Sequence, residues 1–394
     1  MIIGIPREIK DHENRVSLTP SSISSLVISG SKVLIETHAG VKSGYSDNEY
    51  SASGASVIDS AAELYSKADL IVKVKEIQVS KGEDAYLKPH HIIFGFNHFE
   101  SSRELTTAAI ESRATFISFE KVIDQNGQMP ILMPMSRIAG AMAGIWAGFF
   151  QNCTFKHDKL IRLKAGADQI KAKYIDEFER IMNSSIDTEL RRILSLQDKM
   201  TVIFGGGSVG EMAAKICSTL GAKVTIVEKR DTRRKYLQRL NLPKCSIVAA
   251  ADRDILQSAH IIIGSTYEKE KADRVIDDKM LKDISEVRKK IIIDVAVDQG
   301  GNFPFIDSSG KYSPSSTGSI WNPAQTDYFG NMFIRVPNIP SIVPRYASAM
   351  LSKAIVEYVG DIAKGFSRPE VVRAISIRDG KVLDEAIAKA HCLS

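Results

Sequence analysis

The sequence has 394 residues, of which 44% are hydrophobic and 25% are charged, so wholesale disorder and fibrous classes are excluded. At about 100–200 residues per domain, this length predicts two or three domains. The net charge of +5 is small and the 47 acidic residues are interleaved with basic ones, which argues against a nucleic-acid-binding face.

The chain carries no signal for export or membrane insertion. No apolar run approaches the roughly 18–20 residues that span a bilayer, and the first residues, MIIGIPREIK, lack the pattern of a signal peptide. The four cysteines, Cys153, Cys217, Cys245 and Cys392, form no CxxC pair, so neither a metal site nor a disulfide framework is indicated. We expect a cytoplasmic protein with reduced thiols and no membrane partner.

The first part of the chain alternates short apolar strands with helices. Strands are predicted at residues 2–5, 32–36, 70–75, 91–96 and 114–119, and helices at 20–29, 60–68 and 102–112. This alternation is typical of βα units around a parallel sheet. A helix rich in alanine and glycine follows at residues 136–151, and its small side chains would let another helix approach closely.

Residues 154–199 form a highly charged segment with apolar side chains at helical spacing. We expect two helices here, broken at 185–187, with Ser184 or Ser185 capping the second. A surface helical hairpin or insertion is the simpler interpretation, and an arm for oligomerisation or a partner is the alternative.

A second α/β unit begins at Met200. Strands are predicted at residues 201–204, 223–228, 246–249, 260–264, 290–295 and 332–335, helices at 208–220 and 231–240, a long helix at 346–364, and a peripheral tail beyond Arg373. The pattern predicts an α/β fold with two domains joined by the two long helices. A substrate domain would comprise residues 1–134 plus 336–394, and a Rossmann dinucleotide-binding domain residues 135–335.

The strongest local signal is the run Gly205-Gly206-Gly207-Ser208-Val209-Gly210. It follows an apolar strand and opens a helix. About twenty residues later, Glu228 ends the next strand and completes the dinucleotide fingerprint. Gly205 would permit the tight turn, Gly207 the approach of a pyrophosphate, and Gly210 the packing of helix on strand. The free N–H groups of the helix start supply the anion site.

Glu228 predicts NAD rather than NADP, because a carboxylate there accepts hydrogen bonds from a ribose 2′-hydroxyl and repels a 2′-phosphate. A neighbouring basic cluster, whose simpler interpretation is a solvated helix face, keeps NADP as an alternative: Lys229, Arg230, Arg233 and Arg234.

Four polar residues lie in a turn or at predicted strand ends, where open α/β sheets bind ligands: Arg15, Lys75, His98 and Asp298. Singly, each has a structural explanation: a surface ion pair, a solubilising lysine, a helix cap and a turn-forming aspartate. Together with a nicotinamide cofactor, they indicate a site for a charged substrate.

Seven segments, in the same order from Met1 to about Gly365, resemble the alanine dehydrogenase family, which is related to the NAD-binding subunit of proton-translocating transhydrogenase. They are MIIGIPREIKDHENRVSLTP, LIVKVKE, FNH, PILMPMSRIAG, VIFGGGSVGEMAAK, DVAVDQGG and VPNIPSIVPR. The chain departs from the family at Arg137, where an acidic residue is usual, in residues 154–199, and in residues 302–331.

The resemblance implies individual roles. Arg15 and Lys75 would bind the carboxylate and carbonyl of a 2-oxo acid, His98 would be the acid/base group, and Asp298 would orient ammonia or relay its proton. Positions matching the family's cofactor cleft are Met135, Ser136 and Asn338. The transhydrogenase subunit lacks counterparts of Lys75, His98 and Asp298, so the resemblance favours a true dehydrogenase.

The implied activity is reversible, NAD-dependent oxidative deamination of L-alanine to pyruvate and ammonia by a homo-oligomer. Two alternatives stay open. One is a dehydrogenase of another amino acid, or of a secondary amine as in saccharopine and opine dehydrogenases, which the departures around Arg137 and Trp321 allow. The other is a non-catalytic, transhydrogenase-like NAD-binding module.

Overall fold

A computed structural model describes residues 1–152, 177–183, 185–267, 273–297, 300–304 and 329–393. The chain divides into two compact α/β units: unit 1 comprises Met1–Met135 and Ser341–Ser394, and unit 2 comprises Ser136–Pro340. The first crossing between units lies inside helix α5 (Leu132–Asn152), and the second inside the short η7 (Ile339–Ile342), before helix α13 (Pro344–Ala363) begins. Only the first of the two expected long helices therefore spans the boundary.

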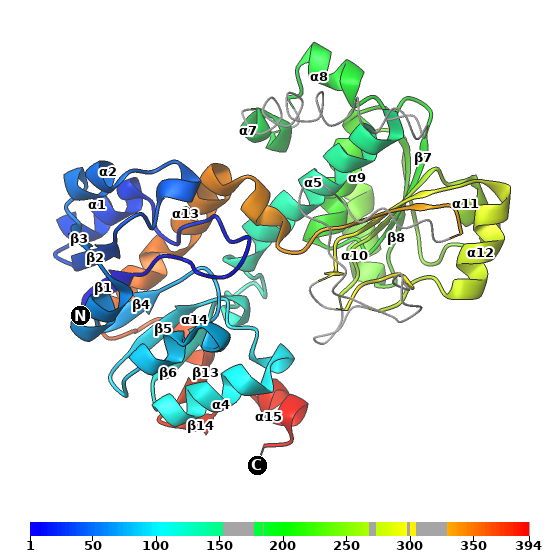
Figure 1. Ribbon diagram of the computed structural model, residues 1–394. Coiled ribbons are helices and arrows are strands. Elements are labelled where there is room, and N and C mark those ends of the chain that lie inside the picture. Colours follow the sequence, from blue (N-terminus) through cyan, green and yellow to red (C-terminus); the bar gives the residue numbers. More distant parts are fainter. Residues whose placement is uncertain (153–176, 184, 268–272, 298–299, 305–328, 394) are drawn as a thin grey trace. The chain divides into compact units, whose positions relative to one another are not determined.

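Within the described part of unit 1, eight strands form one sheet in the order β14-β13-β6-β5-β4-β1-β2-β3 (Figure 1). Their bounds are β1 Ile2–Ile5, β2 Lys32–Glu36, β3 Ser56–Ile58, β4 Leu70–Val72, β5 Ile92–Gly95, β6 Thr115–Ser118, β13 Ile375–Arg378 and β14 Lys381–Val382. Strands β1–β6 pair in parallel, as the βα alternation predicts. Their carboxyl ends therefore share one edge of the sheet.

Helices cover both faces of this sheet. They are α1 (Pro20–Ile28), α2 (Asp47–Ala52), α3 (Ala61–Lys67), α4 (Arg103–Ser112), α13, α14 (Pro369–Arg373) and α15 (Glu385–His391). Buried side chains of α3, α4 and α15, including Leu64, Leu105 and Ile387, join one apolar cluster with strand residues such as Phe116. Helices α1 and α13 contact each other and strands β2 and β4 respectively.

The C-terminal residues are part of the core of unit 1, so the prediction of a peripheral tail beyond Arg373 was wrong. Strand β13 pairs antiparallel with β6, and Ile377 is fully buried in the cluster described above. His391 at the end of α15 is also buried, and its Nε2 lies 2.7 Å from the carbonyl oxygen of Phe99. Strand β13 has only four residues, which is too few for an alternation of apolar and polar side chains to predict a strand. Its pairing with β6 defines it instead.

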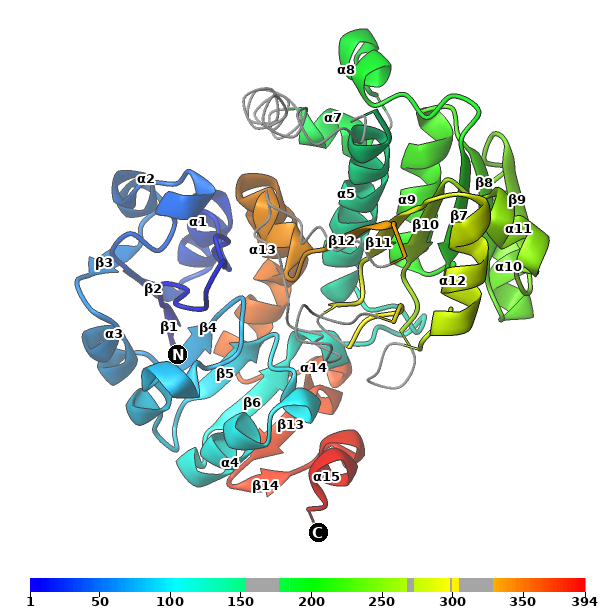
Figure 2. The same cartoon turned by 45° about the vertical axis from the view of Figure 1, so that its right-hand side comes forward.

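The described strands of unit 2 form a parallel sheet in the order β12-β11-β10-β7-β8-β9 (Figure 2). They are β7 Met200–Phe204, β8 Lys223–Val227, β9 Cys245–Val248, β10 Ile261–Gly264, β11 Ile291–Asp294 and β12 Met332–Arg335. The helices are α7 (Phe178–Met182), α8 (Thr188–Ile193), α9 (Ser208–Thr219), α10 (Asp231–Arg239), α11 (Arg253–Ser258) and α12 (Asp278–Val287). This strand order is that of a Rossmann fold.

The small residues of α5 allow another helix to pack closely against it, as the sequence predicts. A Cβ atom on Gly140 would lie 2.1 Å from the carbonyl oxygen of Val209, and one on Gly144 would lie 2.7 Å from side-chain atoms of Ile216. Both contacts fall on α9, the helix that follows the glycine run. Helix α5 thus packs against α9 with almost no side chain between them.

The charged segment is described only in part, since residues 153–176 and 184 lie outside the described residues. The cap of α8 is Asp187, not Ser184 or Ser185, because its carboxylate accepts the N–H groups of Glu189 at 2.7 Å and Leu190 at 3.0 Å. Asp187 lies directly before the helix, where a carboxylate also favours the positive end of the helix dipole.

In the described part of the chain, no helix combines the length and apolar character that crossing a bilayer requires. Cys217, Cys245 and Cys392 are free thiols, and burial raises the pKa of Cys217 to about 12 and that of Cys245 to about 11. Such thiols carry little thiolate near neutral pH and are poor nucleophiles.

Candidate functional site

Three of the four predicted substrate residues follow neighbouring strands of unit 1. Arg15 lies in the loop after β1, Lys75 follows β4, and His98 follows β5. Because β5, β4 and β1 are adjacent and parallel, their following loops leave the same edge of the sheet. The fourth residue, Asp298, lies outside the described residues.

Arg15 is buried and is held by a carboxylate two residues earlier. Glu13 is fully buried and accepts Nε of Arg15 at 2.8 Å and Nη2 at 2.6 Å, while Nη1 of Arg15 lies 3.2 Å from Sδ of Met135. The Nε–Nη2 edge of the guanidinium is therefore occupied by Glu13. A two-donor grip on a substrate carboxylate would have to use Nη1 and the remaining N–H of Nη2.

Lys75 stands in an irregular segment, because β4 ends at Val72 and not at Lys75 as the sequence predicted. Glu8, from the loop after β1, organises this segment: its Oε1 accepts the backbone N–H of Val74 at 2.5 Å, with that of Lys75 at 3.4 Å. Burial raises the pKa of Glu8 to about 7, although the nearby ammonium of Lys73 opposes the shift. Lys73 itself is buried and paired with Glu83.

His98 begins the short helix η4 (Phe99–Ser101) in a left-handed backbone conformation with φ of 48°. Glu120, just after β6, fixes this turn by accepting the backbone N–H of His98 at 2.7 Å, and its Oε1 lies 3.9 Å from Nδ1 of His98. The imidazole stacks on Phe96 with an interplanar angle of 7°. Burial raises the pKa of Glu120 to about 7, against the lowering effect of the His98 N–H.

Each described substrate candidate thus has a carboxylate at its side: the buried Glu13 at Arg15, the buried Glu8 at Lys75 and the half-buried Glu120 at His98. The sequence reasoning missed all three carboxylates. Glu120 could have been found, because it follows an apolar strand just as His98 does. Glu8 and Glu13 lie in a charged loop whose fold no local pattern predicts.

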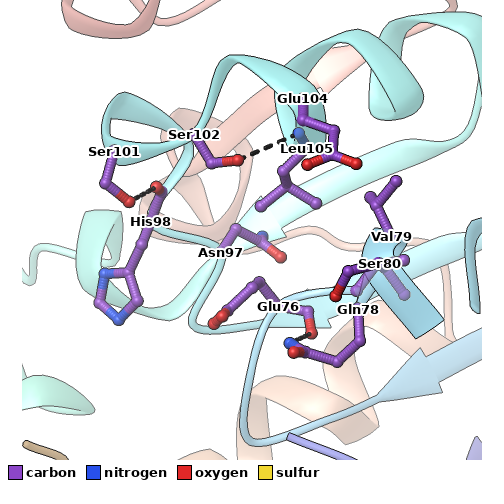
Figure 3. A pocket seen from close by; sticks show the side chains of 11 residues that line it. Glu76, Gln78, Val79, Ser80, Asn97, His98, Ser101, Ser102, Glu104 and Leu105 are labelled. Atoms are coloured by element: carbon purple, nitrogen blue, oxygen red, sulfur yellow. Dashed lines mark hydrogen bonds between the residues drawn. The ribbon is translucent and has the colours of Figure 1, made fainter. Parts of the chain in front are cut away.

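A pocket with a volume of about 140 Å³ opens beside His98 (Figure 3). It is formed by the segment after Lys75 and by the turn that leads into α4. Its polar lining includes Glu76, Gln78, Asn97, His98, Ser102 and Glu104, and its apolar lining Ile77, Val79 and Leu105. The pocket belongs wholly to unit 1.

In unit 2, the glycine run has the geometry that its spacing predicts. Gly205 has φ of +92°, which favours glycine, and a Cβ on Gly210 would lie 1.8 Å from the carbonyl oxygen of Gly205. A Cβ on Gly207, by contrast, would meet no heavy atom within 4 Å. Gly207 is the N-cap of α9, and no side chain caps its free N–H groups. Open space at the uncapped start of a twelve-residue helix fits a pyrophosphate.

Glu228, directly after β8, is buried beside the glycine run. Its Oε2 accepts the backbone N–H of Gly206 at 3.0 Å, and Oε1 accepts the N–H and Nε of Arg230 at 2.9 and 3.0 Å. Burial opposes ionisation, but these hydrogen bonds outweigh it and lower the pKa of Glu228. An ionised carboxylate at this position can accept hydrogen bonds from a ribose diol, and both of its oxygens also pair with the guanidinium of Arg230.

The basic cluster beside Glu228 is engaged within unit 2. Lys229 pairs with Asp273, and Arg233 bonds the carbonyl oxygen of Gly206 at 2.6 Å and the carboxylate of Glu211. Arg234 donates to the carbonyl oxygen of Glu228 at 3.0 Å. These contacts favour the simpler interpretation of the cluster, as side chains that stabilise the loop around the glycine run.

The three remaining cofactor candidates lie in different surroundings. Met135 is buried in unit 1 against Arg15, so its contact is with a substrate candidate. Ser136 is half-buried in α5, and Asn338 is half-buried after β12 with φ of 53°. The contribution of these residues to cofactor binding stays a prediction.

The ends of the DQGG segment are held by Asp294, the last residue of β11. Its carboxylate accepts the backbone N–H of Ala296 at 3.1 Å and of Asn302 at 2.8 Å. Burial raises the pKa of Asp294 to about 6, although Arg335 opposes the shift. The described residues on either side of 298–299 are therefore anchored to the sheet.

Comparisons with known proteins agree with this architecture. The models of the alanine dehydrogenase/PNT N-terminal and C-terminal domains match residues 4–139 and 188–385. An alanine dehydrogenase of Methanococcus maripaludis is 32% identical over all of this chain and 97% of its own, and that of Geobacillus stearothermophilus is 29% identical over 99% and 96%.

Among solved structures, an L-alanine dehydrogenase is 26% identical, covers 99% of both chains and has a TM-score of 0.77. A transhydrogenase of Sinorhizobium meliloti is 20% identical, covers 98% of this chain and all of its own, and has a TM-score of 0.72, which indicates a shared fold. The matches span both units and nearly the full length of the chain. The chain therefore belongs to the alanine dehydrogenase/PNT family.

Proposed function

We propose that this protein is an NAD-dependent amino-acid dehydrogenase that interconverts L-alanine with pyruvate and ammonia. The observation that carries the proposal is the placement of Arg15, Lys75 and His98 in loops at one edge of a parallel sheet. Relatives of full length that bear the name alanine dehydrogenase support it.

Arg15 and Lys75 would bind the 2-oxo acid. The guanidinium of Arg15 would hold the carboxylate through donors other than those bound to Glu13, and Glu13 fixes the plane of that guanidinium. The Lys75 ammonium faces the carbonyl oxygen, where negative charge grows as the amine attacks. Burial of both side chains, at 3% and 8% exposure, strengthens these interactions because water does not screen them.

His98 would move the proton between the reacting nitrogen or oxygen and solvent. Its side chain is 38% exposed, so the imidazole reaches both a ligand and water, and an ordinary imidazole titrates near neutral pH. Glu120 holds the His98 backbone, and its Oε1 lies 3.9 Å from Nδ1 of the imidazole. We propose that Asp298 assists in handling ammonia.

The glycine run, the start of α9 and Glu228 would hold the dinucleotide, with Met135, Ser136 and Asn338 near its nicotinamide. When bound, the nicotinamide donates or accepts the hydride. The buried, ionised Glu228 supports NAD over NADP. We further propose a homo-oligomer, which light scattering after size-exclusion chromatography would test.

The deciding experiment is a panel of 2-oxo acids assayed by NADH absorbance, with and without ammonium. We expect NADH oxidation that requires both pyruvate and ammonium. A preference for another 2-oxo acid, or for a primary amine in place of ammonium, would favour the dehydrogenases of other amino acids or of secondary amines. Tight NADH binding without oxidation by any combination would favour a transhydrogenase-like binding module.

Variants test the individual roles. His98→Ala and Asp298→Ala should each lower turnover by about two orders of magnitude or more while NADH still binds. Normal turnover in either variant would remove that residue from the mechanism. Arg15→Lys should mainly raise the KM for the 2-oxo acid, because lysine lacks the planar fork; an unchanged KM would count against its role.

A further inference from the structure

The pocket beside His98 offers hydrogen-bond acceptors that no described residue satisfies. We infer that this pocket is a subsite for a primary ammonium group, either the ammonium ion itself or the charged amine of a co-substrate or side chain. The inference rests on the proposed function, because it names the nitrogen-bearing substrate that would stand next to His98.

Three acceptor atoms of the pocket lining have no donor among the described residues. Oε2 of Glu76 is buried without a hydrogen-bond partner. Asn97 is 1% exposed and uses its Nδ2 on Ile117 and Ser118, which leaves its Oδ1 without a donor. Gln78 donates its Nε2 to the carbonyl oxygen of Glu76, and its Oε1 likewise accepts from no described residue.

A buried acceptor without a donor is costly, as for Oε2 of Glu76, and together with the two amide oxygens it forms a group suited to a ligand that brings donors. Figure 3 shows Asn97 in the middle of the lining residues, with Glu76 and Gln78 on one side and Leu105 and Glu104 on another. A primary ammonium group carries three or more N–H donors and no acceptor, which is the complement of this lining.

The charges around the pocket also favour a cation. Glu104 is exposed at the start of α4, and no described residue pairs with its carboxylate. Burial opposes ionisation of Glu76, but Lys10 and Lys75 outweigh it and lower its pKa, so Glu76 is ionised near neutral pH. Lys10 binds Oε1 of Glu76, whereas Oε2 is buried and accepts no hydrogen bond from a described residue.

The size of the pocket admits more than one source of the ammonium group. Its volume of about 140 Å³ exceeds the roughly 30 Å³ that a water molecule occupies in the liquid. Ile77, Val79 and Leu105 would contact a short aliphatic chain behind the charged group. An ammonium ion and a short alkylammonium are therefore both sterically possible, and the experiment distinguishes them.

The test measures binding without turnover, by the thermal unfolding of the full chain. Ammonium chloride and n-butylammonium chloride are compared with tetramethylammonium chloride at equal ionic strength, because the last cation has no N–H donor. We expect at least one of the first two salts to raise the Tm by a degree or more above the control salt. Selective stabilisation by ammonium identifies an ammonia subsite, and stronger stabilisation by butylammonium identifies an amine subsite.

Two variants and a matched control locate the effect. Glu104→Lys places a cation at the exposed rim without disturbing the core, and Glu76→Gln removes the buried charge; each should abolish the stabilisation. Glu111→Gln, on the same helix but outside the pocket, should keep it. No extra stabilisation by either salt, or a full response in Glu104→Lys, would overturn the inference.

The inference and the proposed function fail separately. In the NADH assay, Glu104→Lys should raise the KM for ammonium or amine about tenfold while changing the KM for the 2-oxo acid less than twofold. Turnover with ammonium but without any salt-specific stabilisation would refute the subsite alone. Stabilisation that depends on Glu76 and Glu104, without any turnover, would refute the dehydrogenase and retain the subsite.

Discussion

The two units hold their candidate ligands in different ways. In our proposal, unit 1 would use the polar side chains of Arg15, Lys75 and His98, each accompanied by a buried or half-buried carboxylate. Unit 2 uses the backbone: glycines, the uncapped start of a helix and one carboxylate, Glu228. If these proposals are correct, the chemistry of unit 1 should depend on the ionisation of side chains, whereas binding in unit 2 should depend on the space around the backbone.

The largest effect should come from filling that space. Gly210→Ala places a Cβ 1.8 Å from the carbonyl oxygen of Gly205, so the turn and the start of α9 must move apart. We expect NADH affinity to fall at least a hundredfold, together with the Tm, because the backbone cannot relax without losing the turn. Titration of NADH fluorescence and thermal unfolding would measure both, and near-normal values in both would contradict a backbone-built site.

In unit 1, we expect the loss of a buried charge to have a larger effect on stability and substrate binding than the loss of an exposed one. Glu13→Gln keeps the shape of the side chain but removes the charge that pairs with the buried guanidinium of Arg15, and breaking such a buried pair costs on the order of 3 kcal/mol. We expect chemical denaturation to report this loss, and the KM for the 2-oxo acid to rise. Asp11→Asn, in the same loop but exposed, is the control and should change neither; equal effects of the two substitutions would remove the special role of Glu13.

Ionisation also makes the stability of unit 1 depend on pH. The pKa values of Glu8 and Glu120 are about 7 in the folded protein and 4.5 for an ordinary glutamate, so between these values the folded state binds more protons. Each group therefore makes its full contribution to the free energy of unfolding below pH 4.5. This contribution falls as the pH rises to 7, by up to about 3 kcal/mol for each group.

Glu120→Gln should therefore gain stability relative to the parent protein at pH 8 but not at pH 4. Urea denaturation of both proteins at the two pH values would measure the difference. An equal difference at both pH values would show that Glu120 does not titrate as described.

The smallest expected effect sharpens the contrast with Gly210. Gly207→Ala adds a Cβ that meets no heavy atom within 4 Å, at a residue with φ of −67°, so the Tm should stay the same or rise slightly. If a pyrophosphate lies there, NADH affinity should nevertheless fall about tenfold. Unchanged affinity would place the dinucleotide elsewhere.

Much of the fold could be predicted, because both units are built from βα repeats with apolar strands. Strands β1, β2 and β12 have the predicted bounds, and the first crossing between the units was expected in a helix rich in small residues. Strand β13 and helix α15 were missed because a short buried strand depends on its partner β6, which is far away in the sequence.

The candidate site was predicted where chemistry follows a strand, and missed where it depends on a loop. Sequence patterns predicted three polar residues that lie in a turn or next to apolar strands: Arg15, Lys75 and His98. The role of Glu8 emerges only when the loop after β1 meets the segment after β4, more than sixty residues away. Likewise, no spacing rule predicts that Glu13 occupies one edge of the Arg15 guanidinium.

The central claim is that a 2-oxo acid bound by polar side chains of unit 1 condenses with ammonia, with loss of water, and that the resulting imine accepts a hydride at its Cα atom. Incubation with pyruvate, ammonium and NADH carrying deuterium at both C4 positions of the nicotinamide tests it directly, with mass spectrometry of the product. The account predicts L-alanine with one deuterium at Cα, formed at least about a hundredfold more slowly by His98→Ala. Absence of deuterated alanine, or of any other deuterated amino acid across the 2-oxo acid panel, would contradict it.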